Sequence, residues 1–269
     1  MPSPPTSSRT VMDRHRFVGF KDAVVAGHSF GDTQLGTGTA QTAWSASFAL
    51  SNYPLGSFHP ECAAHDTSEC LVRVCTGRSA APVAPFPHAG LVTIAGGKKL
   101  VSLAAGAGGS YSLFQEAALL WEGGETLTLK AAGGDVPGFG ASVTAPGVAT
   151  ITAPAVPPSN GSLTVTRASG LALSWTGGNT DIVATLQNST TGNSDPSTTP
   201  FCTFPASAKS RTIPAAALAY LPAGPSSTLH VLSMSSTTVT AGDWKVRFEA
   251  SANALSPAGK QYTVRMTLQ

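Results

Sequence analysis

A serine between two glycines is the first place in this sequence where chemistry could reside. Residues Gly27 to Gly31 read GHSFG, which matches the Gly-x-Ser-x-Gly pattern of serine hydrolases. In those enzymes a strand delivers the serine to a sharp turn, and a helix follows it. The residues after the motif, DTQLGTGTAQTA, hold two glycines and no apolar stripe of helical period. Ser29 is therefore predicted to be an ordinary exposed hydroxyl, and a serine hydrolase that uses Gly27–Gly31 is only an alternative.

Histidines and aspartates that could build a catalytic triad elsewhere are scattered singly along the chain. A triad is defined by geometry and not by order, so a convergent site stays open. The residues available for one are His28, His59, His65, His88 and His230, with Asp22, Asp32, Asp66, Asp135, Asp181, Asp195 and Asp243. His230 lies in an alternating stretch and is predicted to be a surface or edge residue. The sequence predicts no catalytic residue, and it calls for no cofactor.

The cysteines are a second group of residues that could do chemistry. Cys62, Cys70 and Cys75 lie close together, and Cys202 is far from them. An even number of cysteines in a lysine-poor chain predicts disulfides and an oxidising compartment. The alternative is a zinc site of His59, Cys62 and His65, although the cysteine spacings match structural zinc sites poorly. On one strand Cys70 and Cys75 would point to opposite faces, which favours pairing of Cys62 with one of them.

The elements that position these residues are predicted to be strands. Apolar and polar residues alternate in residues 41–50, 125–132, 161–168, 243–250 and 260–268. This period of two, with Gly-, Pro- and Asn-rich gaps, is typical of antiparallel sandwiches and barrels. The four tryptophans have apolar neighbours and are predicted to be core residues: Trp44, Trp121, Trp175 and Trp244.

Helical signals are rare. Residues 114–121 would suit a short helix or a strand, and residues 213–221 favour a short helix because Pro214 stands at an initial position. We therefore expect an all-β chain with at most one or two short helices.

A proline-rich stretch indicates the domain organisation. Three prolines in residues 152–161 favour an extended connector. We predict a flexible N-terminal arm (residues 1–20), a β-sandwich with the cysteine cluster (21–153), a linker (154–158) and a second β-sandwich (159–269). The predicted fold is thus two antiparallel, immunoglobulin-like β-sandwich domains in tandem.

The composition of the chain argues against some classes of binding partner. Only 11% of the residues are charged and the net charge is +2, with no block of basic residues. Such a chain lacks the electrostatic footprint of a nucleic-acid-binding protein. No apolar run approaches the roughly 20 residues that span a bilayer. The first twenty residues contain no apolar stretch of a secretory signal, although the rest of the sequence favours an extracellular, cell-surface or periplasmic location.

Two resemblances support this view. Residues 171–187, LALSWTGGNTDIVATLQ, resemble the central hairpin of immunoglobulin-like and fibronectin type III sandwiches, which implies a buried Trp175. The cysteine cluster, together with LSWTGG, CTFPAS, IPAAALAYL and VTAGDWKV, resembles uncharacterised secreted and lipoprotein-like β proteins of high-GC bacteria. That resemblance implies a fold and a compartment, but no activity.

The sequence therefore predicts a non-enzymatic, extracytoplasmic protein for binding, adhesion or surface assembly. Its partner would be a protein or a carbohydrate ligand, and Phe86 and Tyr220 are the candidate contacts because they lie in loop-like contexts. A structural subunit of a filament, fibre or capsid is the alternative, and a homo-oligomer is compatible with either.

Overall fold

The structure is a computed structural model. It describes residues 21–26, 31–32, 42–46, 49–51, 62–75, 87–109, 111, 114–116, 120–157, 162–188 and 197–269. Most of these residues lie in strands, which confirms the predicted all-β class. The predicted arm (residues 1–20), Ser29, His59 and Phe86 lie outside the described residues.

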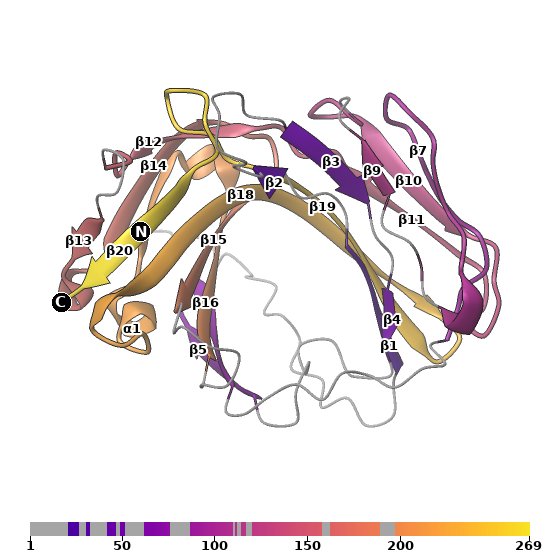
Figure 1. The fold of residues 1–269 in the computed structure, drawn as a ribbon, viewed down its shortest axis with the longest axis horizontal. Coiled ribbons are helices and arrows are strands. Elements are labelled where there is room, and N and C mark those ends of the chain that lie inside the picture. The colour runs from indigo at the N-terminus through magenta and orange to yellow at the C-terminus, as the bar shows by residue number, and fades with distance from the viewer. Residues whose placement is uncertain are drawn as a thin grey trace, which may run out of the picture.

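The largest sheet has ten strands and curves into an arch (Figure 1). Its path is β4-β1-β19-β18-β15-β16-β6-β5, while β20 pairs with β18 and β13 pairs with β20. The strands are β1 (Lys21–Ala26), β4 (Ala49–Ser51), β5 (Cys62–Thr67), β6 (Cys70–Cys75), β13 (Leu163–Val165), β15 (Asp181–Asn188), β16 (Ser197–Phe204), β18 (Gly224–Ala241), β19 (Trp244–Asn253) and β20 (Thr263–Leu268). The β1–β19 and β13–β20 pairs are parallel, and the other pairs are antiparallel.

Three smaller sheets complete the fold. One has the order β11-β10-β7-β8, a second β12-β14-β17 and a third β2-β3-β9. Their strands are β2 (Gly31–Asp32), β3 (Thr42–Ala46), β7 (Val92–Ala95), β8 (Val101–Leu103), β9 (Phe114–Glu116), β10 (Thr126–Ala131), β11 (Phe139–Thr144), β12 (Ala149–Ala153), β14 (Leu171–Gly177) and β17 (Ser210–Ile213). Three 3₁₀ turns, η1 (Ala107–Gly109), η2 (Arg167–Ser169) and η3 (Ala206–Ala208), and one helix, α1 (Ala215–Leu218), lie between the described strands.

Two hydrophobic cores lie between the long sheet and the first two small sheets. The first core lies under the sheet of β7, β8, β10 and β11, and the second core lies under the sheet of β12, β14 and β17. In Figure 1 both of these small sheets cover the outer side of the arch. The sheet of β7, β8, β10 and β11 packs on buried side chains of β19, among them Trp244, Val246 and Phe248. The sheet of β12, β14 and β17 packs on buried side chains of β15, β16, β18 and β20.

Strand β18 takes part in both cores. Leu229 and Val231 near its start belong to one core, and Ala241 at its end belongs to the other. One edge of β18 pairs first with β20 and then with β19, and the other edge pairs with β15. Because side chains alternate between the two faces of a strand, one face of each of these strands packs into a core and the other points to the inner side of the arch.

Residues 171–187 do not form the predicted hairpin. Strand β14 pairs with β12 and β17, whereas β15 pairs with β16 and β18 in the long sheet. Gly177 and Gly178 both have positive φ, 69° and 67°, so the chain turns out of one sheet and enters the other. The predicted burial of Trp175 is confirmed: it is 2% exposed, and its indole N–H donates to the Ala206 carbonyl at 3.0 Å.

Strands from both sides of the predicted linker pair with one another. β1, β4, β5 and β6 precede it in the chain, and they join β19 and β16 in the long sheet. The Tyr262 hydroxyl donates to the Pro154 carbonyl at 2.8 Å, which fastens the start of the linker to the second core. Two tandem immunoglobulin-like sandwiches stay a prediction.

The two predicted helical segments differ. Residues 213–221 contain α1, with Pro214 as its N-cap, as predicted. The segment 114–121 contains strand β9, which is the second of the two alternatives predicted for it. The predicted strand 41–50 is divided into β3 and β4, which belong to different sheets. Trp121 and Trp244 are buried core residues, as predicted.

Candidate functional site

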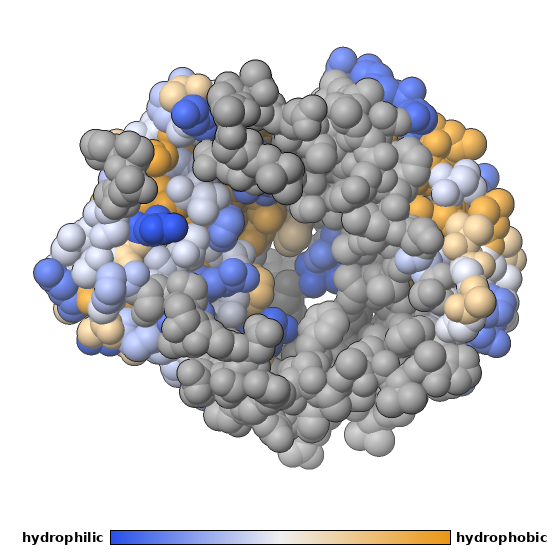
Figure 2. Space-filling view, in the orientation of Figure 1, coloured by the Kyte–Doolittle hydropathy of each residue, from blue (hydrophilic) through white to orange (hydrophobic). Residues whose placement is uncertain are grey.

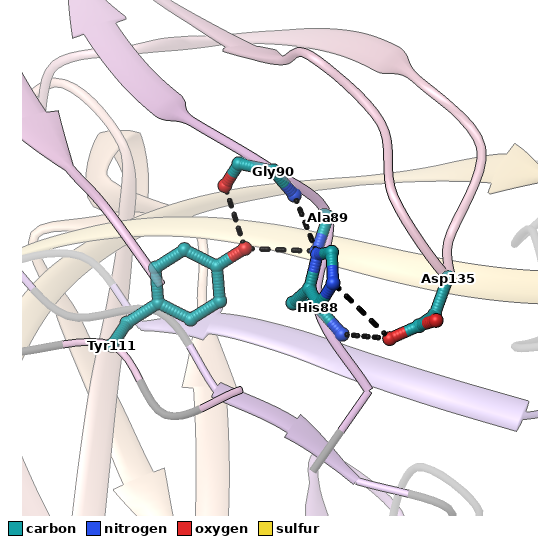
Figure 3. A network of polar contacts seen from close by, with 5 residues as sticks. All are labelled: His88, Ala89, Gly90, Tyr111 and Asp135. Carbon is teal, nitrogen blue, oxygen red and sulfur yellow. Dashed lines mark hydrogen bonds and ion pairs between the residues drawn. The ribbon is translucent and has the colours of Figure 1, made fainter. Parts of the chain in front are cut away.

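Among the candidate triad residues, one histidine and one aspartate come together, in the loops before β7 and between β10 and β11 (Figure 3). His88 Nε2 lies 3.6 Å from Asp135 Oδ2, and the same carboxylate oxygen accepts the His88 main-chain N–H at 3.0 Å. His88 Nδ1 faces the Gly90 amide, which donates to it at 3.4 Å. Both ring nitrogens thus face groups of the loops themselves.

Tyr111 completes this network. Its hydroxyl donates to the Gly90 carbonyl at 2.7 Å and accepts the Ala89 N–H at 2.8 Å. Burial raises the pKa of the Tyr111 phenol, so the hydroxyl stays protonated. These contacts link the residues before β7 to the β10–β11 loop, and we call this network the Tyr111 clamp.

His230 lies on an inner strand of the long sheet and not at the predicted edge, and its side chain is partly exposed to solvent. β18 pairs on both sides at this point, with Thr185 of β15 and Thr263 of β20. The His230 ring is half-buried, and its Nδ1 lies 3.2 Å from the Thr263 hydroxyl. Burial lowers the pKa of His230, because it penalises the charged ring.

The cysteine cluster confirms the predicted disulfide chemistry. Cys70 and Cys202 form a disulfide between β6 and β16, with their Cα atoms 4.0 Å apart. Cys75 is also disulfide-bonded, and the register of β5 and β6 places Cys62 opposite it. Cys70 and Cys75 do not bridge each other, as their positions on one strand predict.

The zinc alternative lacks support in the described residues. His59 lies outside them, and His65 stacks on Tyr220 with ring centroids 4.9 Å apart and an interplanar angle of 27°. No group of three or more His, Cys, Asp or Glu side chains that could hold a metal ion occurs in the part of the chain that the structure describes. This stacking contact joins His65, a predicted zinc ligand, to Tyr220, a residue predicted to contact the binding partner.

An open hollow lies beside the short helix that precedes Tyr220. Its volume is about 500 Å³, and it is shallow and widely open to solvent. Its lining consists of Arg167, Ala168, Ala215, Ala216, Ala219 and Gln269. Four methyl groups thus form an apolar floor, and Arg167 supplies a positive charge.

Arg167 is fixed in place by main-chain contacts. Its Nη1 donates to the Leu221 carbonyl at 3.0 Å, and its main-chain N–H donates to the Gln269 carbonyl at 2.9 Å. Among the described residues its Nε is buried and has no hydrogen-bond partner. A buried donor without a partner costs about 1–3 kcal/mol.

Tyr220 lies two residues after the end of α1, in the turn that follows the helix. Tyr220 is 39% exposed, and the next residue in the chain carries the carbonyl that holds Arg167. We use the name α1 surface for the residues around this helix taken together; they are His65, Arg167, Ala168, Ala215, Ala216, Ala219 and Tyr220.

The α1 surface lies at the end of the arch that shows mixed polarity. In the space-filling view hydrophilic and weakly hydrophobic side chains alternate over this end (Figure 2). Strongly hydrophobic side chains are more prominent at the opposite end, over the sheet of β7, β8, β10 and β11.

Tyr220 is exposed, as its loop-like context predicted, and its role as a ligand contact stays a prediction; Arg167 was not among the candidates. The signal for Arg167 was its place in TRASG, an arginine before a glycine turn in a chain with few charged residues. Its contacts come from α1 and from the end of the chain, which no local pattern shows.

Comparison with known proteins adds no relatives. No family model, no curated protein and no solved structure matches the chain. Among the described helices, none has the length and apolar character needed to cross a membrane.

Proposed function

We propose that this chain is a non-enzymatic, extracytoplasmic binding protein that holds its ligand on the α1 surface. The observation that supports the proposal is the presence of three features around α1. These are an open hollow, a guanidinium held by the Leu221 carbonyl, and the stacked rings of His65 and Tyr220.

The surface has a rigid foundation. His65 lies on β5, which pairs with β6, and the Cys70–Cys202 disulfide joins β6 to β16. A site whose aromatic groups are held in place loses little conformational entropy on binding.

The disulfide also supports an extracytoplasmic location. Disulfides persist in oxidising compartments and are rare in reducing ones. The resemblance of the cysteine cluster and of LSWTGG to secreted β proteins of high-GC bacteria agrees with this location.

The experiment is retention of the protein on immobilised polysaccharides, cell-wall fragments and extracellular proteins. We expect retention on at least one of them, weakened by Tyr220→Leu because the exposed ring is lost. Leu91→Ala is the matched control, since Leu91 is 50% exposed at the other end of the arch. No retention on any material, or equal retention of Tyr220→Leu, would overturn the proposal.

A second experiment addresses the enzymatic alternative. A fluorophosphonate probe should leave the protein unlabelled. Labelling that disappears in Ser29→Ala would establish a serine hydrolase and contradict a non-enzymatic function.

A further inference from the structure

We infer that the β5–β6 hairpin is exchanged between copies of this chain, so that the hairpin of one copy pairs with β16 of another. This inference concerns assembly. It goes beyond the proposed binding function and does not depend on a ligand at the α1 surface.

The strand order separates β4 from β5, although they follow each other among the described elements. They form the two ends of the path through the long sheet, and Figure 1 shows them at opposite feet of the arch. Strands that follow each other in a chain usually lie side by side, because short connections are favoured. The chain must then return from β6 to β7, which belongs to the small sheet over the first core.

The segment between Ser51 and Cys62 is short for this separation. Eight strands form the path, so β4 and β5 are about 34 Å apart along the sheet, at about 4.8 Å for each strand spacing. A flexible chain of the length from Ser51 to Cys62 has a root-mean-square span of roughly 18 Å. The curve of the arch shortens the direct path, but a tethered element loses effective concentration when its linker is shorter than the span. A hairpin from a neighbouring copy can therefore compete for β16.

The hairpin packs on the second half of the chain. β6 pairs with β16 along its whole length, and Cys70 and Val72 are buried in the second core. The turn of the hairpin contributes as well, since Glu69 Oε1 lies 3.5 Å from Arg211 Nε. The same contacts form when the hairpin comes from another copy, which is the condition for a domain swap.

The disulfides make the exchange detectable. The Cys70–Cys202 bond joins the hairpin to β16, so an exchanged hairpin makes this bond between two copies. Cys75 is also disulfide-bonded and lies opposite Cys62 in the same hairpin, so its bond stays within one copy.

The exchange also builds the α1 surface from two copies. His65 lies on β5 and stacks on Tyr220, so one ring of this pair would come from the neighbouring copy. The second copy would thus supply a residue of the candidate site.

Electrophoresis in SDS without a reductant tests the exchange on the purified, oxidised protein. We expect the wild-type chain to migrate as a disulfide-linked dimer or a longer species and to become a monomer after reduction. A monomer from oxidised wild-type protein, with the Cys70–Cys202 bond intact by peptide mass, would overturn the inference.

Two double variants identify the bond that links the copies. Cys70→Ala/Cys202→Ala should migrate as a monomer in SDS without a reductant, whereas Cys62→Ala/Cys75→Ala should keep the linked species. A linked species that persists in the first variant, or that disappears in the second, would contradict the exchange.

A longer connection tests the same inference with all four cysteines in place. Insertion of about twenty Gly and Ser residues between residues 55 and 56 brings the span of the linker close to the separation of β4 and β5. We expect the ratio of monomer to linked species to rise at least about tenfold, because a strained short linker favours swapping. The same insertion between Ala258 and Gly259, in an exposed turn before β20, is the matched control. Equal ratios in the two insertion variants would overturn the inference.

Discussion

Cys70 on β6 and Cys202 on β16 lie directly opposite each other and are joined by a disulfide that spans 132 residues of sequence. Both side chains are buried in the second core. The bond fastens the β5–β6 edge, which carries His65, to the strands that follow the predicted linker.

Removing this disulfide should destabilise the protein. A crosslink over so long a segment restricts the unfolded chain, and its loss typically costs about 2–5 kcal/mol. We expect Cys70→Ala/Cys202→Ala to lower the free energy of unfolding by that amount in urea titrations. An unchanged midpoint would show that the crosslink does not constrain the unfolded state.

Removing a buried hydroxyl should have the opposite effect. Ser233 on β18 is 0% exposed, and among the described residues its hydroxyl has no hydrogen-bond partner. Its neighbours in the register, Ile182 and Ala252, are apolar and fully buried. Ser233→Ala should raise the free energy of unfolding by about 1 kcal/mol, because a desolvated polar atom is lost.

Urea titration measures the effect of Ser233→Ala, with Ser142→Ala as the control. Ser142 is exposed and its hydroxyl meets that of Thr128 at 3.2 Å, so its loss should change stability by less than about 0.5 kcal/mol. A destabilised Ser233→Ala protein would reveal a partner for the hydroxyl.

The sequence predicted where the strands lie better than it predicted which strands pair with each other. Alternation in 243–250 and 260–268 predicted β19 and β20, because a period of two records which face of a strand is buried. The same alternation contains no information on pairing, so the parallel contact of β1 with β19 stayed hidden. Gly177 and Gly178 were visible as a turn, but only the positions of both sheets show that the chain changes sheet there.

The candidate site could likewise be predicted from the sequence only in part. Tyr220 was predictable because it follows an alanine-rich helix and precedes Pro222 and Gly224, in a loop-like context. Its stacking on His65 and the anchoring of Arg167 join segments that are far apart in sequence. Such contacts follow from the packing of α1 between β6 and η2, which is a property of the whole fold.

Alkaline pH should weaken the fold through Tyr262. Burial raises the pKa of this phenol far above its unfolded value of about 10. The folded protein therefore favours the protonated form, and its contribution to stability is complete below pH ~10 and is lost as the pH rises further.

Urea titrations at pH 8 and above pH ~10 check this expectation. The free energy of unfolding of the wild type should decrease between the two conditions more than that of Tyr262→Phe. Equal decreases would show that Tyr262 ionises as readily in the folded protein as in the unfolded one.

The Tyr111 clamp should be detectable as a local effect. Tyr111→Phe leaves the Ala89 amide and the Gly90 carbonyl without the hydroxyl they share. We expect faster hydrogen exchange of the Ala89 amide and a loss of about 1–3 kcal/mol of stability. Gly134→Ala offers a comparison, because its Cβ would lie 2.3 Å from His88 Nδ1 and displace that ring. Unaltered Ala89 exchange in Tyr111→Phe would show that the hydroxyl does not hold the loop.

Strand β18 begins a few residues after α1 and ends in the first core. A force that pulled β18 along its own axis would act on its hydrogen bonds to β15, β19 and β20, which lie across that axis. These bonds would bear the force together in shear and not break one after another. A strand paired on both edges and packed into both cores should therefore resist extraction along its length.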